Sequence, residues 1–304
     1  MSTRITQSMI ARSALNSLND VSQRLAATQK KMSTGKEITR PSDDPYGTSR
    51  ALTLRAELEA TRQLQRNVDE GNGWLTVTDT ALGKMNDVVQ RARELVVSGA
   101  SDTSGATARS AMADEVDQLI DALKQEANAA YGGRYVFAGT QTTTAPYAVG
   151  PSDAYAGDTG TIAREIGPGV AVTVNVDGRS LLGQGTAAGD GLLLDTLRQV
   201  SAHLRGNTAA DADAMRTTDL QALDTNLQNL LRVRAGVGAL QNRLSTAGSR
   251  LAELEETTTG LLSDTEDADM AKTLIDFSTQ QAVYQSALKA GANIVQASLL
   301  DYLR

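Results

Sequence analysis

Apolar residues recur every seven positions between residues 223 and 261. One series is Leu223, Leu230, Val237, Leu244, Leu251 and Thr258, and a second follows three residues behind it: Val233, Leu240, Ala247, Leu254 and Leu261. Paired positions repeated every seven residues over this length are typical of a helix that packs in a coiled coil. The pattern therefore predicts one long helix with a continuous apolar seam.

Both ends of the chain carry the same kind of stripe. The N-terminal stripe consists of Leu18, Val21, Leu25 and Met32, and the C-terminal one of Met270, Leu274, Phe277, Tyr284, Leu288, Val295 and Tyr302. Steps of three and four place each set on one helical face. We expect a helix that ends near Ser33 and another over the last 40 residues.

Between these stripes, the pattern predicts helices over 46–100, 107–130 and 190–206, with a weak point at Gly71 and Gly73. From Tyr131 to Gly189 helical periodicity disappears and Gly, Thr and Pro become frequent. Alternating valines from Val170 to Val176 and the run Tyr135–Phe137 predict strands, and Asp177-Gly178 predicts a hairpin turn. The middle of the chain is therefore expected to hold a small β-rich insertion.

A polar elbow separates the first two predicted helices. Gly35 can adopt the left-handed conformation that ends a helix, and Pro41 cannot continue one. Asp43 and Asp44 follow, and Asp44 is suited to cap the next helix, with Pro45 at its first position. These five residues form the predicted elbow motif.

The predicted fold is mainly α. A long helical hairpin, a coiled-coil rod formed by the N- and C-terminal helices, carries the β-rich insertion at its tip. Three domains are expected: residues 1–42 with 264–304, residues 43–132 with 190–263, and residues 133–189. Opposite net charges, +5 over residues 1–40 and −3 over residues 264–304, favour pairing of the two ends.

Composition excludes several classes of protein. The 304 residues include two Phe and one Trp, fewer large rings than a thick globular core uses, while the net charge of −7 speaks against nucleic-acid binding. The absence of Cys excludes disulfides and thiolate chemistry. No apolar run is long enough for a membrane span, and the first ten residues lack the apolar core of a secretory signal.

The chain offers no residues for an enzyme, a metal site or a cofactor. Its one His, His203, is expected to be a partly exposed structural residue near a helix end. The acidic run 264–269 departs from a calcium-binding loop and is interpreted as a solvated helix start. Helix capping explains the neighbouring carboxylates of Asp43 and Asp44 without an active site.

Three motifs resemble the flagellin family of bacterial flagellar proteins. They are M-S-T-G-K with R-P-S-D-D-P at 32–45, G-R-Y-V-F-A-G at 133–139 with T-A-P-Y at 144–147, and R-A-G-V-G-A-L-Q-N-R-L at 234–244. The second is more similar to the hook-associated branch of the family, which joins hook to filament, than to filament flagellins. The last seven residues resemble a filament flagellin equally well, so a filament flagellin is the alternative. A signalling coiled-coil hairpin is a third possibility, although its tip should be a tight turn.

The resemblance implies a structural role in the flagellum. The terminal helices would form the inner layer of an axial tube, poorly ordered in the monomer, and the insertion would project outward. The residues expected at the assembly interface are Leu18, Val21, Leu25, Met32, Leu274, Phe277, Tyr284, Leu288 and Val295. Implied partners are further copies of the chain, hook-associated protein 1, flagellin and an export chaperone at the C-terminal helix. The implied route is type III export without a cleaved signal.

Overall fold

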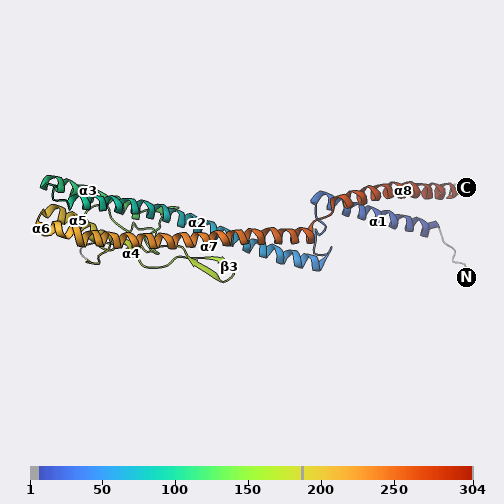
Figure 1. The fold of residues 1–304 in the computed structure, drawn as a ribbon. Helices are drawn as coiled ribbons and strands as arrows, with labels where there is room; N and C mark the ends of the chain where they lie inside the picture. The colour runs from blue at the N-terminus through green and yellow to red at the C-terminus, as the bar shows by residue number, and fades with distance from the viewer. Residues whose placement is uncertain (1–6, 186–187, 303–304) are drawn as a thin grey trace. The chain divides into compact units, whose positions relative to one another are not determined.

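The computed structural model describes the backbone of residues 7–185 and 188–302, and the side chains of Met9 and of residues 12–185 and 188–292 (Figure 1). In chain order the helices are α1 (Gln7–Thr34), α2 (Pro45–Gly99), α3 (Ala106–Ala127), α4 (Arg179–Leu182), α5 (Leu193–Gly206), α6 (Ala209–Ala214), the π-helix η1 (Met215–Asp219), α7 (Leu220–Glu266) and α8 (Met270–Tyr302). The strands are β1 (Ala130–Tyr131), β2 (Arg134–Tyr135), β3 (Ala163–Gly167) and β4 (Val170–Thr173). The predicted mainly α fold with a small β-rich insertion is confirmed.

The chain folds into two compact units. The terminal unit holds the described residues up to Ala60 and those from Leu254 onward, and the central unit holds Thr61–Glu253. Both α2 and α7 contribute to each unit, so the division cuts through two long helices. The three domains expected from the sequence stay a prediction.

In the central unit, α2, α3, α5 and α7 surround one hydrophobic core. The first heptad series of α7 lines that core, since Leu223, Leu230 and Leu244 are fully buried. The second series is half-buried up to Ala247. In the terminal unit its last members, Leu254 and Leu261, are 49% and 41% exposed. The sequence therefore predicts more buried apolar surface at the end of α7 than the chain itself provides.

The glycine pair in α2 does not interrupt the helix, which is continuous from Pro45 to Gly99. A Cβ atom added to Gly73 would lie 2.5 Å from the Tyr131 hydroxyl oxygen, and one added to Gly71 would lie 3.1 Å from Leu244 Cδ1. Both glycines therefore allow close packing of neighbouring segments. The weak point expected there is replaced by a tight contact.

The β-rich segment consists of two antiparallel hairpins, β1–β2 and β3–β4. The second hairpin turns between Gly167 and Val170, where Gly169 has a φ of +71°. The hairpin turn predicted at Asp177-Gly178 is wrong, because Gly178 is the N-cap residue of α4 and no strand follows it. The strand predicted over Tyr135–Phe137 is short: only Tyr135 belongs to β2, and Phe137 is fully buried in the core.

The insertion lies along the side of the helices, which differs from the tip position expected from the sequence (Figure 1). Two contacts attach β3 to the part of α2 that belongs to the central unit. Asn67 Nδ2 donates to the Glu165 carbonyl at 3.0 Å, and Glu70 pairs with Arg164 at 2.8 Å. From Glu70, the α2–α3 turn is about thirty helical residues further along α2, which corresponds to about 45 Å. Arg109 closes that end by donating from Nε to the Gly99 carbonyl at 2.9 Å.

A buried lysine attaches the loop before β3 to α3. The Lys124 side chain is completely buried and pairs with Asp153, and its Nζ donates to the carbonyls of Gly150 at 2.7 Å and Ser152 at 3.0 Å. Asp153 also pairs with Arg198 of α5 at 3.0 Å. Burial alone would raise the pKa of Asp153, but hydrogen bonds from Arg198 and Lys124 hold it below its ordinary value. The loop is therefore fixed by charge-assisted bonds.

We expect Lys124→Ala to lower the free energy of unfolding of the central unit by about 3 kcal/mol, because it removes one partner of a buried ion pair. Urea titration followed by circular dichroism measures this change. The matched control is Lys84→Ala, since Lys84 is 59% exposed and pairs with Glu126 at the surface. This control should cost less than about 1 kcal/mol. Equal losses in the two variants would contradict the role assigned to Lys124.

Candidate functional site

The elbow between α1 and α2 closes on itself through Asp43. Gly35 has a φ of +69° and donates its amide to the Lys31 carbonyl at 2.8 Å, which ends α1. Asp43 Oδ2 accepts hydrogen bonds from the Thr39 hydroxyl at 2.9 Å and the Arg40 amide at 2.9 Å. The bond from the Thr39 side chain is the main reason that the pKa of Asp43 lies below its ordinary value. Asp43 therefore remains a carboxylate that fixes the turn.

Asp44 caps α2, as the sequence predicts. Its Oδ1 accepts a hydrogen bond from the Tyr46 amide at 3.0 Å, and Pro45 occupies the first helical position. A Cβ atom on Gly47 would lie 2.5 Å from Ile38 Cδ1, so the elbow packs closely on the first turn of α2. The cap and this close packing thus define where α2 begins.

Glu266, the last residue of α7, joins the elbow to the C-terminal part of the terminal unit. Its side chain is 6% exposed and pairs with Lys36 at 2.7 Å and with Arg55 of α2. The Glu37 amide donates to the Glu266 carbonyl at 2.8 Å, and the Ala268 amide donates to the Gly35 carbonyl at 2.9 Å. The interpretation of 264–269 as a solvated helix start is therefore wrong for Glu266. It holds for Asp269, whose Oδ1 accepts the Ala271 amide in the first turn of α8.

Burial alone would raise the pKa of Glu266, but hydrogen bonds and charge from Lys36 and Arg55 lower it below the ordinary 4.5. Its stabilising contribution is therefore complete above about pH 4.5 and is lost as the pH falls through the lower pKa of the folded state. We expect Glu266→Gln to weaken the elbow by about 1–3 kcal/mol, since both cations lose their charged acceptor.

Hydrogen exchange at the Glu37 and Ala268 amides measures this weakening and should be faster in Glu266→Gln. The control is Glu37→Gln, because Glu37 pairs with Lys31 at the surface and should contribute less than about 1 kcal/mol. Unchanged exchange at both amides in Glu266→Gln would show that the ion pairs do not hold the elbow.

In the terminal unit, α1 packs against α8. Apart from Lys30 and Lys31, the half-buried positions of the two helices repeat in steps of four and three: Ala14, Leu18, Val21, Leu25, Thr28 and Met32 on α1, and Phe277, Gln280, Tyr284, Ala287 and Gly291 on α8. The repeat is that of a two-stranded coiled coil with large and small residues interleaved. Six of the nine predicted interface residues therefore lie on the faces that the two helices turn toward each other.

The remaining predicted interface residues lie elsewhere. Leu274 is 58% exposed and Leu288 is 43% exposed, so both face away from the α1–α8 seam. Val295 belongs to α8, but its side chain lies outside the described residues. Two further exposed residues, Leu15 and Ile275, are 62% and 65% exposed and are not among the nine predicted from the sequence. Neither residue lies at the alternating spacings of three and four that define the predicted stripe on its helix, so the stripe does not indicate them.

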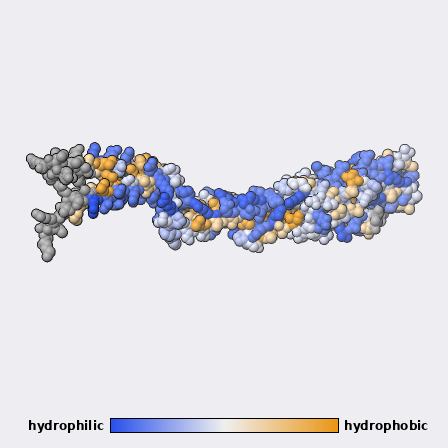
Figure 2. All heavy atoms as spheres, turned by 180° about the vertical axis from the view of Figure 1, so that it is seen from behind, coloured by the Kyte–Doolittle hydropathy of each residue, from blue (hydrophilic) through white to orange (hydrophobic). Residues whose placement is uncertain are grey.

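Hydrophobic atoms are visible at the surface of the terminal unit (Figure 2). Among the described residues of this unit, the side chains of Leu15, Leu274, Ile275, Val283 and Leu288 are exposed. Exposed apolar side chains that gather on one unit mark a candidate surface for contact with other chains.

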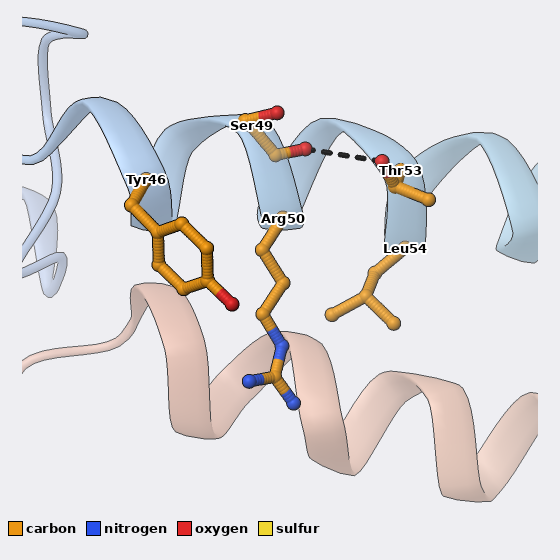
Figure 3. Close-up of a pocket in the computed structure, with 5 residues that line it drawn as sticks. All are labelled: Tyr46, Ser49, Arg50, Thr53 and Leu54. Carbon is orange, nitrogen blue, oxygen red and sulfur yellow. Dashed lines mark hydrogen bonds between the residues drawn. The ribbon is translucent and has the colours of Figure 1, made fainter.

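A hollow of about 260 Å³ lies beside the first turns of α2. Tyr46, Arg50 and Leu54 reach from α2 toward a neighbouring helix, while Thr53 donates to the Ser49 carbonyl at 3.1 Å (Figure 3). Tyr46 is 77% exposed. Exposed Tyr and Arg side chains are common at energetically important contacts between proteins, so this surface is a second candidate for subunit contact.

His203 has the structural role expected from the sequence. It is 29% exposed, and its Nδ1 lies 2.8 Å from Oδ2 of Asp219, a buried residue of η1. Among the residues that the structure describes, no group of three or more His, Asp or Glu side chains could hold a metal ion. Nor does any helix in the described part of the chain have the length and apolar character needed to cross a membrane.

Paired terminal helices with exposed apolar side chains and a separate, mainly helical central unit define a helical structural protein. The chain belongs to the flagellin family. Residues 5–142 match the bacterial flagellin N-terminal helical region, and residues 220–303 match the C-terminal helical region. It is therefore a structural component of the bacterial flagellum and not an enzyme.

Relatives cover nearly the whole chain. Flagellar hook-associated protein 3 of Escherichia coli K12 is 28% identical over 289 residues, 90% of each chain. Flagellin of Bacillus subtilis 168 is 29% identical over 309 residues, 96% of this chain and 97% of the relative. Both the hook-associated and the filament branch of the family are thus similar to this chain at about the same level.

Solved structures share the fold. A protein of Vibrio parahaemolyticus assigned as a flagellar hook-associated protein superposes with a TM-score of 0.65 at 23% identity, covering 74% of this chain and all of that one. Flagellar hook-associated protein 3 of Legionella pneumophila gives 0.59 at 15% identity, covering 70% and 98% of the two chains. At these identities the likenesses concern the fold alone.

Proposed function

We propose that this chain is the hook–filament junction protein of its flagellum. The observation that carries the proposal is the G-R-Y-V-F-A-G and T-A-P-Y pair of motifs, which is more similar to the hook-associated branch than to filament flagellins. Phe137 and Tyr147 of these motifs are fully buried, and the Tyr147 hydroxyl donates to the Gly183 carbonyl at 2.8 Å. The motifs thus build the core of the insertion, the part in which members of one helical family differ most readily.

Assembly is assigned to the terminal unit. The α1–α8 seam, lined by Leu18, Leu25, Phe277 and Tyr284, would hold each copy together, while the outer residues Leu274 and Leu288 would contact neighbouring copies. Val295 is proposed for the same surface on its spacing alone. Covering these apolar side chains with other subunits supplies the driving force for a ring or tube.

A junction protein has two different faces, and each face contacts a different protein. We propose that one face contacts hook-associated protein 1 and the other face contacts the first flagellin subunits. The terminal helices would form the inner layer of the tube, the helices of the central unit the next layer, and the insertion the outer surface. A chain with both ends in one helical pair suits this role, because each added subunit presents the same pair to the next.

Export is proposed to follow the flagellar type III route without a cleaved signal, with a chaperone covering the C-terminal helix. Exposed apolar side chains on α8, such as Ile275 and Leu288, would otherwise promote association before export. A chaperone that covers this helix would keep the chain monomeric until it leaves the cell.

The alternative is a filament flagellin, favoured by the similar identity to the Bacillus subtilis protein and by the last seven residues. Copy number separates the two functions. We expect mass spectrometry of isolated flagella to find a fixed number of copies per flagellum, unchanged when filaments are sheared to half their length at the distal end. A copy number that falls in proportion to filament length would show a filament protein instead.

A further inference from the structure

A second hollow of the terminal unit lies between the outer face of α1 and the elbow, with a volume of about 380 Å³. Its lining consists of Gln23, Ala26, Ala27, Lys30, Lys31, Thr39, Arg40 and Asp43. Three of these eight residues, Lys30, Lys31 and Arg40, are cationic. The α1–α8 seam uses a different face of α1, so this hollow is separate from the assembly surface proposed above.

The positive charge of the hollow is only partly compensated. Lys30 Nζ donates to the Thr39 hydroxyl at 2.8 Å, which is a neutral partner, while Lys31 pairs with Glu37. Asp43 is the one carboxylate in the lining; its Oδ2 accepts from Thr39 and from the Arg40 amide, and the charge of Lys30 acts on it, so one carboxylate faces three cations. Within the described part of the chain, the Arg40 guanidinium has no carboxylate partner. The hollow therefore favours an acidic occupant.

The α7–α8 turn has the complementary charge. Asp264, Asp267 and Asp269 are exposed, and only Glu266 of this turn is paired with cations in the described residues. Asp267 accepts from the Ser263 hydroxyl and Asp269 caps α8, whereas Asp264 has no such bond among the residues described. The turn therefore presents unneutralised carboxylates on a rigid support.

The turn of the same chain does not occupy the hollow. It is held at Gly35–Glu37 by backbone hydrogen bonds of 2.8 and 2.9 Å, and none of its residues belongs to the lining. We propose that the hollow receives the acidic α7–α8 turn of a second copy, with Arg40 and Lys30 facing Asp264 and Asp267. This contact rests on the proposed assembly of the chain. Because it joins two different surfaces, it repeats head to tail and generates a ring or helix.

Charge exchange tests the contact. Arg40→Glu and Asp264→Arg each place like charges together and should reduce incorporation into flagella about tenfold, whereas the double variant restores opposite charges and should recover most of it. Incorporation is measured as the fraction of flagella labelled by antibody against the chain. Arg232→Glu, at an exposed position of α7 in the central unit, is the control and should label normally.

Two outcomes overturn the contact: single variants that label like the control, or a double variant no better than the worse single one. Failure of the junction function looks different. In that case the antibody labels the whole filament, or no part of the flagellum, already in the wild type. If the wild-type chain lies along the filament, the incorporation of the charge variants can still be measured there.

Cysteine pairing provides an independent measurement, because the chain has no Cys of its own. Flagella carrying both Arg40→Cys and Asp264→Cys should give, on oxidation, a ladder of covalent multimers. Each single variant should remain monomeric, since the contact joins unlike surfaces. A double variant that stays monomeric on oxidation would overturn the proposal.

Discussion

Replacing Leu288 with Asp is expected to abolish assembly while the central unit stays folded. Leu288 is 43% exposed in the single chain, so the charge remains solvated before assembly and costs little there. Once neighbouring subunits cover this face, the variant loses the burial of a Leu side chain and gains an unpaired buried charge. A loss of about 3 kcal/mol per contact corresponds to more than a hundredfold weaker association.

Motility in soft agar and antibody labelling of flagella measure this effect, and circular dichroism confirms that the chain is folded. Val149→Asp is the matched control, since Val149 is 57% exposed in the insertion of the central unit. The control should swim and label normally. Normal motility and labelling in Leu288→Asp would remove α8 from the assembly surface.

The second large effect is expected at Phe137, the aromatic residue of the G-R-Y-V-F-A-G motif. Phe137 is fully buried, and its carbonyl accepts the Tyr155 hydroxyl at 2.8 Å. Phe137→Ala should lower the free energy of unfolding of the central unit by about 3–5 kcal/mol, because the cavity it leaves cannot close. Urea denaturation measures the change.

Val170→Ala is the comparison for Phe137→Ala. Val170 is 44% exposed in β4, so this truncation should cost less than about 1 kcal/mol. A similarly small loss in Phe137→Ala would mean that the motif is recognised by a partner and does not serve packing. The expected large loss would instead explain the motif as the core of the insertion.

The helical part of the fold could be predicted because its signal is periodic. Leu223, Leu230 and Leu244 repeat every seven residues, and each is fully buried. The elbow was equally predictable, since Gly35 and Asp44 act through their own backbone and the next turn of chain. Both features depend on residues close in sequence, where spacing alone carries the information.

The insertion was less predictable because its structure depends on distant contacts. Val172 and Val174 are buried, as the alternation predicts, but the alternation continues to Val176, beyond the end of β4 at Thr173. Asp177-Gly178 has the composition of a hairpin turn, yet Gly178 packs against Phe137 and precedes α4 as its N-cap residue. Tertiary packing thus overrides the local preference of short segments.

The terminal unit has features that depend on nearby residues and features that depend on distant contacts. The stripe at Leu18, Leu25, Phe277 and Tyr284 correctly indicates two helices, but a stripe cannot tell a seam within one chain from a contact between chains. The buried position of Glu266 was not predictable, because its partners Lys36 and Arg55 lie more than 200 residues away in sequence. Nothing in the acidic run 264–269 distinguishes this carboxylate from its solvated neighbours.

Immunogold electron microscopy of isolated, intact flagella tests the junction function most directly. The antibody should be raised against the β-rich insertion, which is expected on the outer surface of the assembly. The account predicts one band of label where the hook meets the filament. Label along the entire filament, or no label on flagella that contain the chain, would contradict it.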